Sequence, residues 1–174
     1  MGSTLIVDNI EGATTAANVK MPAGSIVQMQ HLKNTTANAA SVAATYPQAS
    51  GFKLSITPKF ATSKILVMFD IDSWIDGGNN SNKIAKYGIR LNSQSNTLVA
   101  DKRVGFNDDG GANNNSSLDT GNQVMLIHLD TPGNTNPQEY ELMLGRWASQ
   151  YDNNVKINGG GFGHSTVTLL EIAQ

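Results

Sequence analysis

Histidine and carboxylate side chains are the groups of this sequence best suited to chemistry, and they are sparse. The chain has three histidines and no cysteine. His128 and Asp130 lie two residues apart, so in a strand they would share one face. We interpret them as a hydrogen-bonded structural pair, because no serine stands in a recognisable nucleophile turn that would complete a triad. The sequence therefore predicts no catalytic residue and no enzyme.

Metal-binding patterns are also missing from the sequence. Neither His31 nor His164 has a second histidine at the spacing of a zinc motif, and no thiolate is available. Oxygen ligands occur in two polar stretches, residues 76–82 and 107–117, but neither has the spacing of an EF-hand loop with its closing glutamate. We predict no bound metal and no cofactor.

The same two polar stretches are the predicted binding surface of the molecule. They hold too few apolar residues to build a core, and long surface loops on a rigid scaffold are where binding tends to reside. The candidate surface-binding residues are Asp76, Asn79, Asn80, Asn82, Asp108, Asp109, Asn113 and Asn114.

Two other local features suggest chemistry and receive structural interpretations. The run 159–163, Gly-Gly-Gly-Phe-Gly, does not connect a strand to a helix as a phosphate-binding loop would, so we predict a hairpin turn. Trp74 and Trp147 are candidates for sugar stacking or for a subunit contact, and burial in the core is an equally good explanation for each.

Size and composition bound the remaining classes. With 174 residues and 39% hydrophobic content, the chain can form one domain with a single core. A net charge of -2 provides no basic surface for nucleic acid. No apolar run approaches the ~20 residues of a membrane span, and we expect a soluble protein without an export signal.

The elements that would position these groups are β-strands. Strand signals recur from residue 25 onward, each bounded by Gly, Pro, Asn or Asp, which is typical of a sandwich or barrel. No stretch has a convincing helical period. We predict strands at 25–32, 52–57, 64–71, 84–91, 97–101, 124–129, 140–147, 153–158 and 165–172.

Two of these strands are apolar on both faces. In residues 65–72 the odd positions are all apolar, and the even positions are apolar early and acidic later. Residues 124–129 show a similar doubling, although an antiparallel sandwich strand usually turns one face to water. Something must cover the second face, and another copy of the chain is the expected cover. We therefore predict a homo-oligomer.

The first residues form a separate predicted unit. Residues 1–23 are too few to hold a core, and they end at a Pro-Ala-Gly break. We predict an extended N-terminal attachment segment at 1–23 and a single folded domain at 24–174. The apolar residues that need an outside partner in that segment are Leu5, Ile6, Val7 and Ile10.

Several short motifs, in order along the chain, resemble a known family. They are TLIVDNIEG at 4–12, VKMPAGSIVQ at 19–28, LSITPKFATSKILV at 54–67, VKIN at 155–158 and STVTLLEI at 165–172. Together they resemble the knob domains of tail fibres and other surface proteins of marine, cyanophage-like tailed phages. The resemblance spans most of the chain, except for the middle from residue 76 to residue 122.

The resemblance implies an antiparallel jelly-roll β-sandwich, similar to tumour-necrosis-factor-like domains, that forms a homotrimer on the virion. It carries over no catalytic residue. From this resemblance we predict that the chain contacts other virion proteins and, at the host surface, glycans. Only about two dozen residues precede the domain here, which favours a seat directly on the virion surface, as in a capsid decoration or a short tail appendage. The alternative is a carbohydrate-binding module of a larger enzyme system.

Overall fold

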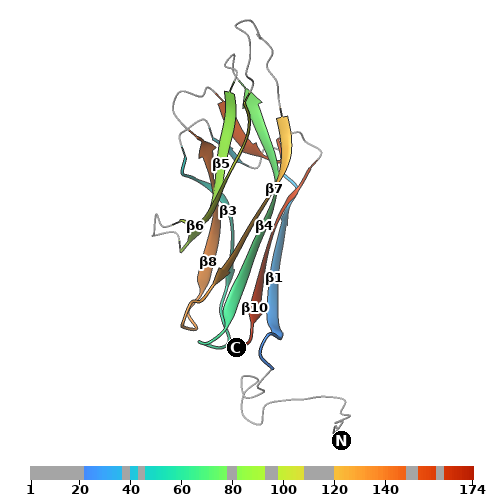
Figure 1. The fold of residues 1–174 in the computed structure, drawn as a ribbon. Helices are drawn as coiled ribbons and strands as arrows, with labels where there is room; N and C mark the ends of the chain where they lie inside the picture. The colour runs from blue at the N-terminus through green and yellow to red at the C-terminus, as the bar shows by residue number, and fades with distance from the viewer. Residues whose placement is uncertain are drawn as a thin grey trace, which may run out of the picture.

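The computed structural model describes residues 22–36, 40–42, 46–77, 82–92, 98–107, 120–147, 153–159 and 163–174. Within these ranges the secondary structure is all β (Figure 1). The strands are β1 (Ile26–Asn34), β2 (Ala40–Val42), β3 (Gln48–Ile56), β4 (Lys64–Gly77), β5 (Asn82–Leu91), β6 (Leu98–Asn107), β7 (Thr120–Asp130), β8 (Gln138–Arg146), β9 (Asn153–Ile157) and β10 (Ser165–Ile172).

The strands form two antiparallel sheets packed as a sandwich, which confirms the predicted fold class. A six-stranded sheet has the order β1-β10-β4-β9-β2, with β7 paired to β4 as well, and a four-stranded sheet has the order β3-β8-β5-β6. Six of the nine connections between consecutive strands cross from one sheet to the other, in the manner of a jelly roll, and only β1–β2, β5–β6 and β9–β10 stay within a sheet. We call these the large sheet and the small sheet.

On one edge of β4 in the large sheet, the neighbouring position is shared by two separate strands, β9 and β10. β9 pairs with β4 at residues 73–77 and β10 pairs with β4 at residues 64–70, and both are antiparallel to it. They therefore run in the same direction along one edge of β4. The hairpin predicted for residues 159–163 is wrong, because the two strands that flank this run do not pair with each other.

Asn158 lies directly after β9, where the pairing along this edge of β4 is interrupted before β10 begins. Its backbone has a left-handed φ of 56°, which asparagine tolerates better than most residues. Its buried amide donates to the carbonyls of Asn34 (3.0 Å) and Thr36 (3.1 Å) and accepts from the Ser165 hydroxyl (2.8 Å). The side chain thereby links the ends of β1, β9 and β10.

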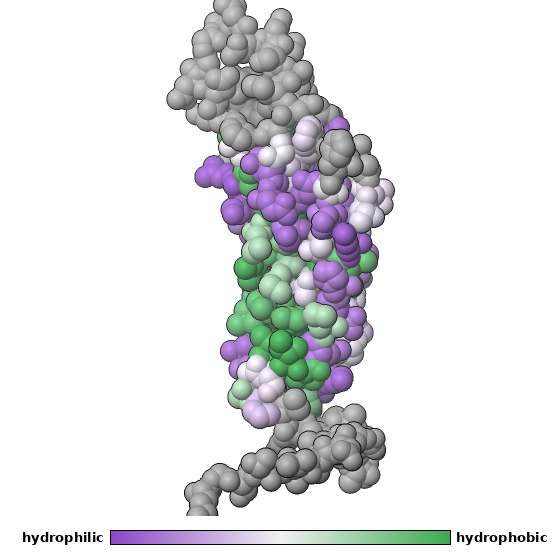
Figure 2. Space-filling model, turned by 90° about the vertical axis from the view of Figure 1, so that its right-hand side faces the viewer, coloured by the Kyte–Doolittle hydropathy of each residue, from purple (hydrophilic) through white to green (hydrophobic). Residues whose placement is uncertain are grey.

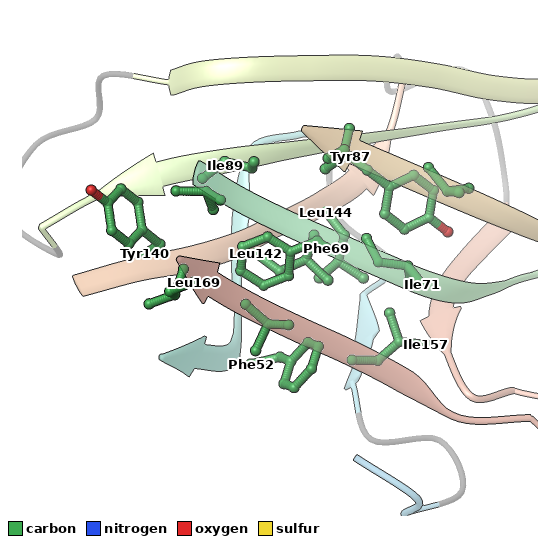
Figure 3. Close-up of a cluster of buried hydrophobic side chains, with 14 of the residues drawn as sticks. Phe52, Phe69, Ile71, Tyr87, Ile89, Tyr140, Leu142, Leu144, Ile157 and Leu169 are labelled. Atoms are coloured by element: carbon green, nitrogen blue, oxygen red, sulfur yellow. The ribbon is translucent and has the colours of Figure 1, made fainter. Parts of the chain in front are cut away.

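The core lies between the inner faces of the two sheets (Figure 3). Phe69 of β4 and Phe52 of β3 meet edge to face at 5.8 Å across it. The odd residues of β4 are fully buried, as the sequence pattern predicts, namely Ile65, Val67, Phe69, Ile71, Ser73 and Ile75. The core also contains one pair of hydroxyl groups, since the Tyr87 hydroxyl lies 2.6 Å from that of Ser73.

A buried carboxylate ties the C-terminal strand to the β3–β4 connection. Glu171 accepts hydrogen bonds from the backbone N–H of Lys59 (2.9 Å) and Phe60 (3.1 Å) and from the side-chain amide of Gln28 (2.6 Å). Burial acts to raise its pKa, but the hydrogen bonds outweigh burial and lower the pKa. The ionised group thus belongs to the fold rather than to an exposed site.

Every predicted strand corresponds to an observed one, with boundary differences. β4 extends to Gly77, β6 extends to Asn107 and β7 begins already at Thr120, all beyond the predicted limits. The short strand β2 has no counterpart among the predictions. The predicted attachment segment lies outside the described residues, except for its last two, Pro22 and Ala23.

Candidate functional surfaces

The outer face of the large sheet carries a continuous apolar surface. Strand register places Met29, Leu170, Leu66 and Leu129 in one row across β1, β10, β4 and β7. The next row along the strands contains Met68 and Ile127, and the rows on either side contain Met125, Ile26 and Ile172. We call these nine residues the apolar face.

The edge strands expose most of this surface to solvent. The exposed fractions are 58% for Ile26, 61% for Met29, 53% for Met125, 55% for Ile127 and 49% for Leu129. Figure 2 shows the apolar residues gathered over one half of the molecule, below a hydrophilic half. Scattered exposed apolar residues are ordinary, but a contiguous patch of this kind marks an interaction site.

Polar side chains bound the apolar face toward the other half. The His31 ring nitrogen lies 2.9 Å from the Thr168 hydroxyl, and Gln123 donates to Asp70 at 2.5 Å. Lys33 lies in the same row as Asp70, two strands away. The even positions of β4 thus change from Leu66 and Met68 to acidic residues, as the sequence pattern indicates.

Beyond that boundary the outer face is filled by its own side chains. A Cβ on Gly159 would lie 2.2 Å from the Trp74 side chain, and one on Gly163 would lie 1.8 Å from that of Asp72. Trp74 therefore packs over glycine rather than standing free as a sugar platform. Burial raises the pKa of Asp72, and the nearby His164 partly offsets this.

A cation and aromatic cluster lies on the outer face of the small sheet. The Arg103 guanidinium stacks 4.3 Å from the centre of the Trp147 ring. Lys86 lies over both Trp147 (5.4 Å) and Tyr46 (4.7 Å), and it forms an ion pair with Asp101. Trp147 remains 39% exposed, so this cluster contains an accessible indole that is contacted by two cations.

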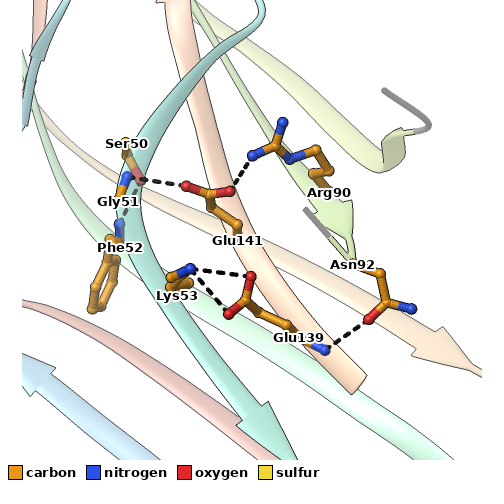
Figure 4. Close-up of polar contacts among 8 residues, drawn as sticks. All are labelled: Ser50, Gly51, Phe52, Lys53, Arg90, Asn92, Glu139 and Glu141. Carbon is orange, nitrogen blue, oxygen red and sulfur yellow. Dashed lines mark hydrogen bonds and ion pairs between the residues drawn. The ribbon is translucent and has the colours of Figure 1, made fainter. Parts of the chain in front are cut away.

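The rest of that outer face is a network of paired charges (Figure 4). Glu141, which is buried, pairs with Arg90 and accepts from the Gly51 N–H at 3.2 Å. Lys53 pairs with Glu139 at 3.1 Å. The outward-pointing Met143 of β8 is also buried. The small sheet thus covers its own second face.

The predicted binding loops are only partly described. Asp76 lies within β4 and Asn82 begins β5, so both are strand residues rather than loop residues as predicted. The other candidates, Asn79, Asn80, Asp108, Asp109, Asn113 and Asn114, lie outside the described residues, as do Leu5, Ile6, Val7 and Ile10. The strand ends that flank these loops, at Gly77, Asn82, Asn107 and Thr120, lie together at one end of the sandwich, opposite Pro22.

The predicted histidine and carboxylate pair does not hold. Asp130 instead accepts from the Tyr140 hydroxyl (2.7 Å) and the Thr131 N–H (2.8 Å). Across the part of the chain that the structure describes, no three His, Asp or Glu residues cluster in a way that could hold a metal. No helix in the same part is long and apolar enough to cross a membrane.

Comparison with known proteins gives structural likeness only. No protein-family model matches the chain, and no curated protein sequence does. Its fold is similar to part of dimeric latent PorU from Porphyromonas gingivalis, with a TM-score of 0.41, 10% identity, and 88% of this chain and 14% of that chain covered. It is also similar to part of VP2 of infectious bursal disease virus in a subviral particle, with a TM-score of 0.36, 13% identity, and 86% and 39% covered.

A third structure, from the Gx strain of the same virus, gives a TM-score of 0.37 and 15% identity over 84% of this chain and 37% of that chain. This chain therefore spans well under half the length of these proteins. At such identities and TM-scores, the likeness transfers no function.

Proposed function

We propose that this chain is a structural protein of a bacteriophage virion, displayed on the outside as the knob of a tail fibre or spike or as a capsid decoration. In this proposal it works by assembly, as a homotrimer attached to other virion proteins, and not by catalysis. The virion setting rests on the ordered sequence motifs. The assembly rests on one observation, the contiguous apolar face that a lone subunit would leave in water.

The two ends of the sandwich support a division of labour. The chain enters at Pro22, where Gly24 and Ala173 are joined by a backbone hydrogen bond of 2.8 Å. The strand ends that flank the polar loops lie at the opposite end. Residues 1–23 would bind the virion at the first end, and the loops would face the host surface at the second.

Localisation in the particle tests this proposal. An antibody against the purified chain should label intact phage by electron microscopy, and the chain should be present in purified particles by mass spectrometry. Deletion of residues 1–21 should abolish incorporation while the remaining chain stays folded and oligomeric. Absence of the chain from purified particles would overturn the proposal.

Carbohydrate binding is the second candidate function, and the accessible Trp147 favours it. Within the described residues, the stacked Arg103 has no carboxylate partner, so its donors can meet the acidic group of a sugar. Glycan-array binding should then favour acidic sugars. Trp147→Ala should abolish the binding, whereas Trp74→Ala, on the packed indole, should leave it in place once the fold is verified.

A further inference from the structure

We propose that a second copy of this chain covers the apolar face, with the β1 side of one subunit packed against the β7 side of the next and the strands of both running in the same direction. This inference deepens the proposed function, because it names the partner of the same surface. It is nevertheless tested on purified protein, away from any particle.

The position of the exposed apolar side chains is the first argument. Of the seven large apolar side chains exposed among the described residues, five lie on the apolar face, and all five belong to β1 and β7: Ile26, Met29, Met125, Ile127 and Leu129. These are the two outer strands of the large sheet, one at each side of β10 and β4. A head-to-tail contact between subunits would use both sides at once.

The chemistry of the rows points to an apolar partner. The two central rows, from Met29 to Leu129 and from His31 to Ile127, contain no Asp, Glu, Lys or Arg. A nucleic acid or another charged polymer could form no ion pairs with these rows, and the methionine, leucine and isoleucine side chains would remain exposed to water. Another copy of this chain provides a surface of matching chemistry.

Charges at the boundary of the apolar face agree with the direction of packing. Lys33 lies on the β1 side and Asp70 lies toward the β7 side, at the same level along the strands. If copies pack in the same direction, equal levels meet, so Lys33 of one subunit approaches Asp70 of the next. The same direction also puts every Pro22 at one end, as attachment to a common virion surface requires.

Cysteine cross-linking tests this arrangement, because the chain has no cysteine of its own. Met29 and Leu129 lie in one row, three strand spacings apart, which is about 14 Å. A disulfide within one subunit is therefore impossible, since Cα atoms more than about 7 Å apart cannot be bridged. A chain carrying both Met29→Cys and Leu129→Cys should give covalent multimers under mild oxidation, with a ladder that ends at three.

The single variants are the matched controls for the cross-link. Neither Met29→Cys nor Leu129→Cys alone should cross-link efficiently. A covalent dimer from either single variant would show a two-fold contact and overturn the head-to-tail arrangement. Absence of multimers from the double variant, at concentrations where native mass spectrometry finds oligomers, would also overturn it.

A second pair of variants tests the surface itself without cysteine. Ile127 and Gln30 are both exposed on outer strands of the large sheet, but only Ile127 belongs to the apolar face, because Gln30 pairs with the inward-pointing Leu169. In sedimentation at micromolar concentration, Ile127→Lys should be a folded monomer, whereas Gln30→Lys should keep the wild-type oligomer. A wild-type protein that remains monomeric at ~100 μM, or an Ile127→Lys protein that stays oligomeric, would overturn the inference.

These outcomes are separable from the proposed function. Oligomers with the expected cross-link, from a chain that is absent from phage particles, would support the contact and refute the virion role. Monomers from a chain that is present in phage particles would refute the contact and support the virion role.

Discussion

The two outer faces of this sandwich differ in how their side chains are covered from solvent. On the small sheet, Tyr46, Glu141 and Arg90 fold over or pair across the surface, and even the outward Met143 is buried. On the large sheet, no described residue of the chain covers the half that carries Met29 and Ile127 in this way, and these side chains remain more than half exposed. Where the chain supplies no cover for apolar side chains, the cover is expected from another molecule.

The comparison also separates stability from assembly. The buried side chains on the small sheet's outer face, such as Glu141 and Met143, have partners within their own chain, so changes to them should alter the free energy of unfolding. Side chains on the apolar face have few partners within the chain, so changes there should alter association and leave a dilute subunit nearly unchanged.

The largest effect is expected on the inner side of β4. Phe69→Ala should lower the free energy of unfolding by about 3 to 5 kcal/mol, because Phe69 is fully buried against Phe52. Met68→Ala, one residue away on the outer side, should cost at most about 1 kcal/mol. Urea denaturation of both variants measures the contrast, and equal losses would mean that the two sides of β4 are equally packed.

The next effect concerns the ion pair beneath the small sheet's outer face. Glu141→Gln should cost about 3 kcal/mol, because it leaves the mostly buried Arg90 guanidinium without its counter-charge. The double variant Arg90→Met with Glu141→Leu should recover most of this loss, since an apolar pair removes both charges together. Thermal denaturation at fixed protein concentration checks both, and no loss in the single variant would contradict the pairing.

A smaller and pH-dependent effect is expected at Glu171. Its pKa is lowered in the fold from the ordinary value of 4.5, because the hydrogen bonds to the carboxylate outweigh burial. Its stabilising contribution is therefore complete above that value and is lost as pH falls through the lower folded pKa. Glu171→Gln should cost about 2 kcal/mol at pH 7 and should flatten the acid side of the stability profile, measured by urea denaturation. If the stability of Glu171→Gln falls with pH as steeply as that of the wild type, then groups other than Glu171 cause the acid sensitivity.

Strand period explains why most of the fold was predictable from the sequence. The alternation in β4 and β10 reports the two faces directly, and the doubled apolar character of β4 and β7 indicates a surface that needs a partner. The contribution of β1 was missed, because its sequence, IVQMQHLKN, alternates as an ordinary edge strand would. Only its place in the sheet sets Met29 beside Leu170.

Other features depend on partners that are distant in the sequence. β2 is only three residues long, and its pairing with β9 defines it. The break between β9 and β10 depends on Asn158, whose amide binds carbonyls more than 120 residues earlier. In sequence, the glycine run at 159–163 has the composition of a hairpin turn, so the local residues alone predict one. The exposed Trp147 was a candidate from the sequence, but the stacked Arg103 comes from a different strand.

The smallest effects on the fold should distinguish the two outer faces most sharply. In a subunit too dilute to associate, both Lys53→Ala, on the small sheet, and Met29→Ser, on the apolar face, should change stability by no more than about 0.5 kcal/mol. Lys53 is an exposed partner in a surface ion pair, and Met29 is 61% exposed. At higher concentration the two should diverge, because an oligomer that forms only from folded subunits raises the thermal midpoint with concentration. The wild type and Lys53→Ala should show this rise, and Met29→Ser should show a much weaker one. A midpoint for Met29→Ser that rises as steeply as the wild-type midpoint would mean that the exposed methionine takes no part in association.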